Sequence, residues 1–542
     1  MTTKLESLNY VKDSLYSIGY DGGKIAKNYP IITDNKVIYF DFVAFGHDKI
    51  QDTSTSCILV KYCDNEKEEI QVVEESVYSA TPILIVPKRN KVNVWKISVE
   101  KRSEKIWELK YDELGEHFGL NRVKLDYNKI VSSKEEIEQL TFFNANNLFK
   151  FASKINCELL GKEFKNAIHK GKKAINVNNE QEVKDLTSIT MHIIAAKILN
   201  DKLVLGKRYQ NIHDTIGILS TQYSDYFNKE YLYKYGRQLI DLVYNSFRDD
   251  LSYRSIDNKI LGNFYENTLF ESDEIKNKEL KQELGIYYTP HYIVNNMLRV
   301  MPIEFLDFRN RYVLDGSCGS GSLLIGAYKR LKSLLPKKMN EELKHKYLTN
   351  AIRGIDIDKF ACEVARLELL LTSIPFGNGW QIYNEDFQII NNMDYKPSII
   401  VANPPYKEIR EGEQIEKATL FLEKYIEILE DNGLLAIVLP ESFLENNSGK
   451  IARQKLLNNI DIYEIWSLPK GIFDTNNCAT TVIIGSKVKE TKLKDAPFKV
   501  RIVNKNKTSI NNFKTKGDFD FDFVCESQKK LLNNHNYKII FS

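Results

Sequence analysis

The sequence predicts an α/β protein whose C-terminal half is a doubly wound, mostly parallel sheet, preceded by a helical domain and an N-terminal α+β domain. Three observations support this fold class. Apolar strand-like runs alternate with helical patterns from about residue 284 onward. Apolar residues recur every three or four positions between about residues 131 and 283. Runs rich in β-branched and aromatic residues dominate residues 1–130.

Length and composition narrow the class of protein. A chain of 542 residues is too long for one ordinary core, so several domains are expected. The formal net charge of +3 means that a nucleic-acid surface would have to be a local patch. The seven cysteines form no CxxC pair, which argues against a disulfide framework or a zinc site. Without a secretory signal or a long apolar run, we expect a cytoplasmic protein with no membrane contact and no metal.

The first two regions are justified by their local patterns. In residues 1–130, a helical pattern at 5–20 precedes strand-like runs at 36–45, 56–63, 81–87 and 91–98. In residues 131–283, helical patterns cover 134–160, 182–201 and 231–251. The charges near residues 148–174 suit phosphate contacts or an ordinary solvated face, and both interpretations stay open.

Strands and helices alternate in residues 284–487. Strands are expected at 311–317, 353–358, 398–405 and 433–440, with helices beginning at Ser322, Lys359 and Lys417. This alternation predicts a parallel sheet with helices on both faces. Residues 478–487 are expected to form the final strand, and residues 488–542 a short appendage.

A glycine-rich stretch follows the first of these strands. Its notable residues are Asp315, Gly316, Cys318, Gly319 and Gly321. Glycines let a backbone turn sharply and approach a ligand closely. The spacing is neither G-x-G-x-x-G nor a P-loop. The alternative is a strand-to-helix turn that holds no ligand.

Acidic residues follow the next two strands. Asp356 ends the second strand, where a carboxylate can accept hydrogen bonds from two ribose hydroxyls, while Asp358 suits the N-cap of the following helix. Asp386 and Phe387 follow the third strand and could hydrogen-bond and flank a flat heterocycle. The alternative for the latter pair is an ordinary polar loop.

The fourth strand runs into Asn403, Pro404, Pro405 and Tyr406. The two prolines fix φ and remove two backbone donors, so the loop presents acceptors with little freedom. An asparagine oxygen and a neighbouring carbonyl can accept both hydrogens of an –NH2 group, and Tyr406 can stack on the ring that carries it. The pattern therefore predicts a rigid clamp for a planar amine.

Together, in this order, the four segments resemble S-adenosylmethionine-dependent N6-adenine DNA methyltransferases. Residues 284–298, with Tyr288, Thr289 and Pro290, are similar to the segment that contacts the methionine moiety in that family. Phe473 matches its base-stacking position. The motif order is that of the γ arrangement, and the match spans roughly residues 260–487. Many relatives have proline where this chain has Gly316.

The resemblance implies a Rossmann-like methyltransferase sheet, S-adenosyl-L-methionine as cofactor, and methylation of an adenine flipped out of double-stranded DNA. It implies the modification component of a restriction–modification or related phage-defence system. Protein-glutamine methyltransferases also use Asn-Pro-Pro-Tyr, so a glutamine amide is an alternative substrate. A non-enzymatic scaffold is a further alternative, but the intact Asn403 and Tyr406 speak against it.

Residues outside this match suggest the wider system. Residues 260–270 resemble the region ahead of the catalytic domain in modification subunits, and residues 1–130 resemble a restriction nuclease. Asp41 and Lys61 match that nuclease pattern, but Leu59 stands where an acid is needed, which predicts a degenerate site. The alternative is a bifunctional enzyme with an active nuclease.

The chain is expected to need partners. Only 69 residues follow Phe473, and the basic segment from about residue 488 is short for a base-reading domain. We therefore expect a separate specificity or target-recognition subunit, with a restriction subunit as a further candidate partner.

Overall fold

The computed structural model describes residues 3–33, 36–99, 102–135, 145–248, 252–256, 289–390, 395–406, 408–410, 413–415, 417–473, 478–488, 497–525 and 528–539. The chain divides into two compact units, residues 1–264 and residues 265–542. The finer domain boundaries expected near residues 130, 283 and 487 stay predictions.

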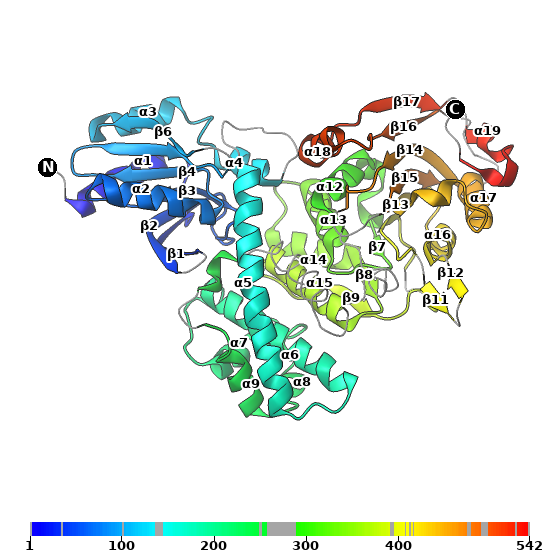
Figure 1. Ribbon diagram of the computed structural model, residues 1–542, viewed down its shortest axis with the longest axis horizontal. Coiled ribbons are helices and arrows are strands. Elements are labelled where there is room, and N and C mark those ends of the chain that lie inside the picture. The colour runs from blue at the N-terminus through cyan, green and yellow to red at the C-terminus, as the bar shows by residue number, and fades with distance from the viewer. Residues whose placement is uncertain are drawn as a thin grey trace. The chain divides into compact units, whose positions relative to one another are not determined.

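The first unit begins with an α+β region (Figure 1). Its six-stranded sheet follows chain order, β1-β2-β3-β4-β5-β6, and only β3 and β4 pair in parallel. Helix α1 packs on α3. The bounds are α1 Lys4–Ser17, β1 Ile25–Ile32, β2 Val37–Phe45, β3 Ser56–Val60, α2 Glu66–Glu75, β4 Ile83–Pro87, β5 Val92–Lys96, β6 Glu104–Leu109, α3 Leu114–Leu120 and α4 Tyr127–Glu135. The expected strands are confirmed, whereas β1 and β6 were not predicted.

The described residues between 145 and 244 are mainly helical, as the spacing of apolar residues predicted. Its helices are α5 Ala145–Ala174, α6 Glu180–Asp201, α7 Ile212–Gln222, α8 Lys229–Leu232 and α9 Arg237–Tyr244. The long helix α5 packs against α6 and α9 (Figure 1). Helix α6 is buried on all sides from Ser188 to Asp201, so it is the centre of this helical core.

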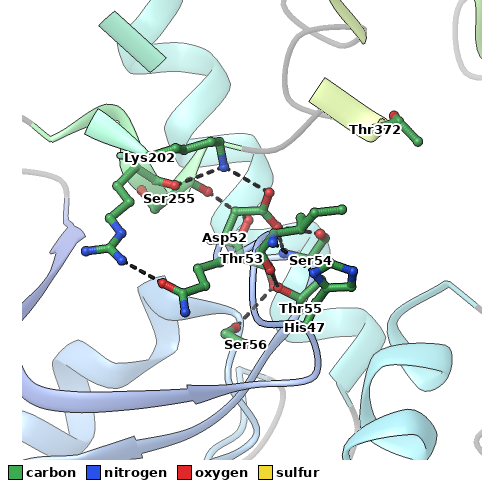
Figure 2. Close-up of polar contacts among 12 residues, drawn as sticks. His47, Asp52, Thr53, Ser54, Thr55, Ser56, Lys202, Ser255 and Thr372 are labelled. Carbon is green, nitrogen blue, oxygen red and sulfur yellow. Dashed lines mark hydrogen bonds and ion pairs between the residues drawn. The ribbon is translucent and has the colours of Figure 1, made fainter. Parts of the chain in front are cut away.

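A buried ion pair joins the β2–β3 loop to the helical region (Figure 2). Lys202, just after α6, places its Nζ 2.9 Å from Asp52 Oδ2, and both side chains are less than one tenth exposed. Lys202 also donates to the Arg254 carbonyl at 3.0 Å. Thr53 donates through its backbone N–H to the Ser255 carbonyl at 3.3 Å. These bonds fix residues 252–256 against the β2–β3 loop.

The second unit contains a nine-stranded sheet in the order β17-β16-β14-β15-β13-β10-β7-β8-β9. The five strands β13, β10, β7, β8 and β9 are mutually parallel, and β15 runs antiparallel between β13 and β14. The bounds are β7 Val313–Asp315, β8 Ile352–Asp356, β9 Gln381–Asn384, β10 Ile399–Ala402, β13 Leu434–Pro440, β14 Ile460–Leu468, β15 Thr480–Lys487, β16 Phe498–Ile502 and β17 Phe521–Cys525. The expected α/β fold with a mostly parallel sheet is confirmed.

Helices cover both faces of this sheet, so it is doubly wound. One buried cluster contains residues of α12, α13, α14, α15 and α18, and another contains residues of α16, α17 and α19. The helices are α12 His291–Val300, α13 Ser322–Ser333, α14 Glu341–Ala351, α15 Lys359–Thr372, α16 Lys417–Ile428, α17 Lys450–Asn459, α18 Lys507–Lys516 and α19 Gln528–Leu532. A short hairpin, β11 Glu408–Arg410 and β12 Glu413–Ile415, follows β10. Helices α13, α15 and α16 begin at the residues predicted.

One expectation about the C-terminal segment is wrong. Residues 478–487 do not provide the final strand, because β16 pairs in parallel with β14 and β17 pairs with β16. The buried Phe498 and Val500 of β16 belong to the core of the sheet. Part of the segment expected to be an appendage therefore belongs to the nine-stranded sheet. Across the described residues, no helix is long and apolar enough to cross a membrane.

Candidate active site at the carboxyl edge of the sheet

The sequence-predicted polar residues meet at one edge of the sheet. Asp315 ends β7 and Asp356 ends β8, while Asp386 follows β9 and Asn403 follows β10. Because these four strands are parallel, their carboxyl ends lie at the same edge. The strand order reverses between β7 and β10, and open α/β sheets place their ligand crevice at such a switch point.

The glycine-rich loop after β7 is tied to β8. The backbone N–H of Cys318 donates to the Ile355 carbonyl at 3.0 Å, and that of Gly319 donates to Asp356 Oδ2 at 2.8 Å. Gly319 and Gly321 have φ of +52° and +91°, values that side chains other than glycine rarely adopt. A Cβ on Gly319 would meet no atom within 4 Å, so the loop has an open side there.

Asp315 is fully buried beneath this loop. Its Oδ1 accepts the Ser317 backbone N–H at 3.0 Å, but Oδ2 has no hydrogen-bond partner among the described residues. Burial, together with repulsion from Asp356, raises the pKa of Asp315 to about 8. The carboxyl group therefore holds a proton at neutral pH, and its second oxygen is left for a ligand.

Asp358 caps helix α15, as the sequence predicted, whereas Asp356 accepts hydrogen bonds from the surrounding backbone. The Asp358 side chain accepts the Phe360 N–H at 3.0 Å and is the N-cap of α15, which confirms its capping role. Asp356 accepts the backbone N–H groups of Gly319 and Asp358. Burial raises the pKa of Asp356 to about 6. Each carboxylate oxygen has a further lone pair that can accept from a ribose hydroxyl. This contact stays a prediction.

Phe387 packs directly on Gly316. A Cβ on Gly316 would lie 2.7 Å from the Phe387 ring, which is closer than real Cβ contacts come. Phe387 is 1% exposed, and Asp386 beside it accepts the Gln388 N–H at 2.9 Å. Glycine at this position thus makes room for the aromatic ring.

Helix α16 contributes two residues that sequence reasoning missed. The Tyr425 hydroxyl accepts the Gly316 N–H at 2.9 Å, and its ring lies 4.9 Å from that of Phe387. Lys424 donates to the carbonyls of Phe387 and Gln388. The sequence signal was weak, because Tyr425 is one of several residues on the apolar face of a predicted helix and Lys424 is the ordinary charged residue before it.

Asn403 is held by side chains on both sides. Its Nδ2 donates to Thr289 Oγ1 at 3.0 Å, and its Oδ1 lies 3.4 Å from the Tyr406 hydroxyl, which donates to it. Asn403 and Tyr406 are 7% and 5% exposed. Pro404 and Pro405 follow Asn403 without regular secondary structure. The amide is therefore fixed rather than free to rotate.

The remaining predicted contact residues are Tyr288, Thr289, Pro290 and Phe473, of which the last three are described. Thr289 and Pro290 lead into α12, and Pro290 is its N-cap. Tyr288, and the motif at residues 260–270, lie outside the described residues. Phe473 is 2% exposed within the apolar cluster of α12 and α13, so its stacking role stays a prediction.

The residues present fit an adenosyl cofactor. The open side of Gly319, the free oxygen of Asp315 and the carboxylate of Asp356 lie on adjoining strand ends. These features offer close backbone approach, a carboxylic O–H donor at Asp315 and carboxylate acceptors for hydroxyl groups at Asp356. The residues expected to line the cofactor site are Asp315, Gly316, Cys318, Gly319, Gly321, Asp356, Asp386 and Phe387, with Thr289 and Pro290 next to it.

The residues of the first unit that were predicted to match a nuclease pattern are engaged by other groups. Asp41 Oδ1 lies 3.0 Å from Lys4 Nζ, and Oδ2 accepts the Tyr62 N–H at 2.7 Å. Lys61 donates to the Tyr39 carbonyl at 2.7 Å, and Leu59 is fully buried. Among the described residues, no group of three or more His, Cys, Asp or Glu side chains could hold a metal ion.

Comparison with known proteins finds a matching family model and curated relatives. The family model described as N-6 DNA Methylase matches residues 256–522. The chain is 25% identical over 331 residues to the methylase subunit of the type I restriction enzyme EcoEI of Escherichia coli, covering 58% of this chain and 65% of that protein. It is 28% identical over 289 residues to the type II restriction enzyme and methyltransferase RM.Eco57I of Escherichia coli, covering 38% of this chain and 29% of that protein.

A solved structure shows a weaker likeness. The type I restriction–modification methyltransferase subunit of Streptococcus thermophilus aligns with a TM-score of 0.45 and 17% identity, over 71% of this chain and 98% of that one. The present chain thus spans less than two thirds of the length of the two curated relatives named above. The match over residues 256–522, together with these curated relatives, confirms the resemblance to N6-adenine DNA methyltransferases of restriction–modification systems.

Proposed function

We propose that this chain transfers a methyl group from S-adenosyl-L-methionine to N6 of adenine in double-stranded DNA, as the modification component of a restriction–modification or phage-defence system. The observation that carries the proposal is the fixed amide of Asn403 at the carboxyl end of β10. It stands beside a glycine loop and carboxyl groups suited to the cofactor.

The chemistry follows from this placement. A flipped adenine would donate its amino hydrogens to Asn403 Oδ1 and to the carbonyl of Pro404, and Tyr406 would stack on the base. Two acceptors favour a pyramidal amino nitrogen whose lone pair is free to attack. When bound, the cofactor supplies an electrophilic methyl group. Because the protein's main task is then to align the two reactants, positioning supplies much of the rate enhancement.

The test removes the amide. Asn403→Ala should lower methylation of adenine in plasmid DNA by at least about 100-fold, as expected for loss of a hydrogen bond made in the transition state. Affinity for S-adenosylhomocysteine should change little. Asn350→Ala is the matched control, because Asn350 is an exposed residue of α14 in the same unit. Near-normal methylation by the Asn403 variant would refute the proposal.

We also propose that the N-terminal region is a degenerate restriction-nuclease fold. The support is Leu59, buried where an acid is required, together with an Asp41 carboxylate already occupied by Lys4 and Tyr62. A divalent ion would lack the second carboxylate that hard cations need. Supercoiled plasmid incubated with the chain, Mg²⁺ and cofactor should stay intact. Sequence-specific cutting would favour the bifunctional alternative.

Sequence-specific modification is proposed to require a separate specificity subunit. The support is that β16 and β17, in the described C-terminal segment, belong to the sheet of the second unit and not to a separate domain that reads base edges. The purified chain alone should bind DNA weakly and with steep salt dependence. Mapping modified adenines in a mixed-sequence plasmid tests this, and efficient methylation confined to one short motif would overturn it.

A further inference from the structure

Thr289 contacts the amide that the proposed reaction depends on. Its Oγ1 accepts a hydrogen bond from Asn403 Nδ2 at 3.0 Å. Thr289 is 2% exposed and Asn403 7% exposed, so water does not compete freely for either group. The two residues are 114 positions apart in the sequence, and the bond connects the lead into α12 with the end of β10.

The orientation of an asparagine amide is decided by its partners. The NH2 and carbonyl ends have nearly the same shape, but one only donates and the other only accepts. Here the acceptor at Thr289 takes the NH2 end, which leaves Oδ1 as the accepting end, close to the Tyr406 hydroxyl at 3.4 Å. That second contact is long, so the shorter Thr289 bond has the larger influence on the orientation.

We propose that Thr289 is a positioning residue that fixes the Asn403 amide with its oxygen directed to the substrate amine. This inference rests on the proposed function. In the opposite orientation, the NH2 end of Asn403 would face the amino group of adenine, and two donors would meet. Thr289 prevents that arrangement, because its hydroxyl gives the NH2 end an acceptor in a buried setting.

This role is distinct from a contact to the cofactor. A threonine hydroxyl has one donor hydrogen and two acceptor lone pairs. Accepting from Asn403 uses one lone pair and leaves the hydrogen for another acceptor. Thr289 can therefore serve the methionine moiety, as the resemblance implies, and also fix the catalytic amide. A loss in the saturated rate separates the second role from the first.

Two substitutions test the hydroxyl. Thr289→Val keeps the shape but removes the acceptor, and Thr289→Ser keeps the acceptor but removes the methyl group. In single-turnover reactions with saturating cofactor and DNA, Thr289→Val should be about tenfold slower than the wild type, in line with loss of one neutral hydrogen bond. Thr289→Ser should stay within about twofold of the wild type, since that bond is retained.

A matched control and a second measurement separate positioning from packing. Thr349 of α14 is also buried, but its hydroxyl bonds to the backbone of its own helix, at His345 and Lys346. Thr349→Val should react at the wild-type rate. Calorimetry with S-adenosylhomocysteine reports cofactor affinity for every variant. If Thr289→Val lowers only this affinity and leaves the saturated rate unchanged, the inference is refuted.

A measurement without substrate distinguishes failure of this inference from failure of the proposed function. In protein labelled with ¹⁵N-asparagine, the side-chain NH2 signals of Asn403 are identified by their absence in Asn403→Ala. These signals should move in Thr289→Val and stay in place in Thr289→Ser. If the wild type methylates no adenine, the proposed function fails, while these signals still test the bond. If Thr289→Ser behaves like Thr289→Val in rate and signals, the methyl group matters and the inference is overturned.

Discussion

Replacing Asp315 with asparagine should remove most of an unusual pH dependence of stability in the second unit. Asp315 is fully buried, and its pKa of about 8 stands far above the ordinary value of 3.8. Below about pH 4, both the folded and the unfolded chain hold the proton, so this group gives stability no pH dependence there. Between about pH 4 and pH 8, the folded state keeps a proton that the unfolded state has released, so stability falls as the pH rises.

The magnitude follows from this pKa. Between pH 6 and pH 8, a group with a folded pKa of about 8 lowers the free energy of unfolding by roughly 2 kcal/mol, since each pH unit corresponds to about 1.4 kcal/mol while the proton is held. Asp356, whose pKa burial raises to about 6, adds less than about 0.5 kcal/mol in this window. For a unit of this size, roughly 2 kcal/mol corresponds to a shift of about 4–8 °C in Tm.

The assay is calorimetric unfolding of the full chain at pH 6, 7 and 8, in wild type and in Asp315→Asn. The transition of the second unit is identified in the wild type by its shift with S-adenosylhomocysteine. The wild type should gain Tm as the pH falls from 8 to 6, and Asp315→Asn should show a much flatter dependence. Asn retains an oxygen for the Ser317 N–H, which keeps the loop contact. Equal pH slopes in both proteins would mean that Asp315 is ionised in the folded state, and the reasoning from burial would fail.

Three further predictions follow from the described contacts. Asp356→Ala should weaken S-adenosylhomocysteine binding by roughly 1.5–3 kcal/mol if its carboxylate holds the ribose hydroxyls, and unchanged affinity in calorimetry would assign that contact elsewhere. Phe473→Ala should lower base flipping, reported by 2-aminopurine fluorescence at the target position, by roughly 1–3 kcal/mol, and a wild-type signal would show that the ring only packs in the core. Lys202→Met leaves the buried Asp52 carboxylate without its ion-pair partner, so the first unit should lose roughly 3–5 kcal/mol of unfolding free energy in urea titration. A loss below about 1 kcal/mol, the level of an exposed pair, would contradict that burial argument.

The sequence predicted those parts of the fold that depend on local pattern. The strands β7, β8, β10 and β13 are short apolar runs bounded by glycine, aspartate or proline, and parallel strands buried on both faces have this composition. The helix starts at Ser322, Lys359 and Lys417 could likewise be predicted from the local sequence pattern.

Strand β14 was missed for a physical reason. It contains Glu464, an acid that is buried, so its sequence does not look like a core strand. The carboxylate accepts the Trp466 indole N–H at 2.8 Å and pairs with Arg501 Nε of β16 at 3.2 Å. The compensating charge lies on a strand far along the chain, and no local pattern reveals it.

In the candidate site, too, features set by local sequence were predicted, and contacts between distant segments were not. Motif spacing placed Asp315, Asp356 and Asn403 at one edge of the sheet, because strand ends can be read from the sequence. It could not show that Thr289 bonds to Asn403, or that Tyr425 bonds to the glycine loop, because these contacts depend on how distant segments pack.

The pairing of β16 with β14 has a practical consequence for anyone who wishes to isolate the second unit. Shortening the protein after Lys487 would remove the hydrogen-bonded neighbour of Glu464, Ile465, Trp466 and Ser467. It would leave Glu464 without Arg501 and expose the apolar surface that Phe498 and Val500 now cover. A bare strand of this kind can pair with the same strand of another molecule, so the shortened protein should be recovered as aggregates. A fragment meant to stay monomeric should therefore extend past Cys525, the last residue of β17.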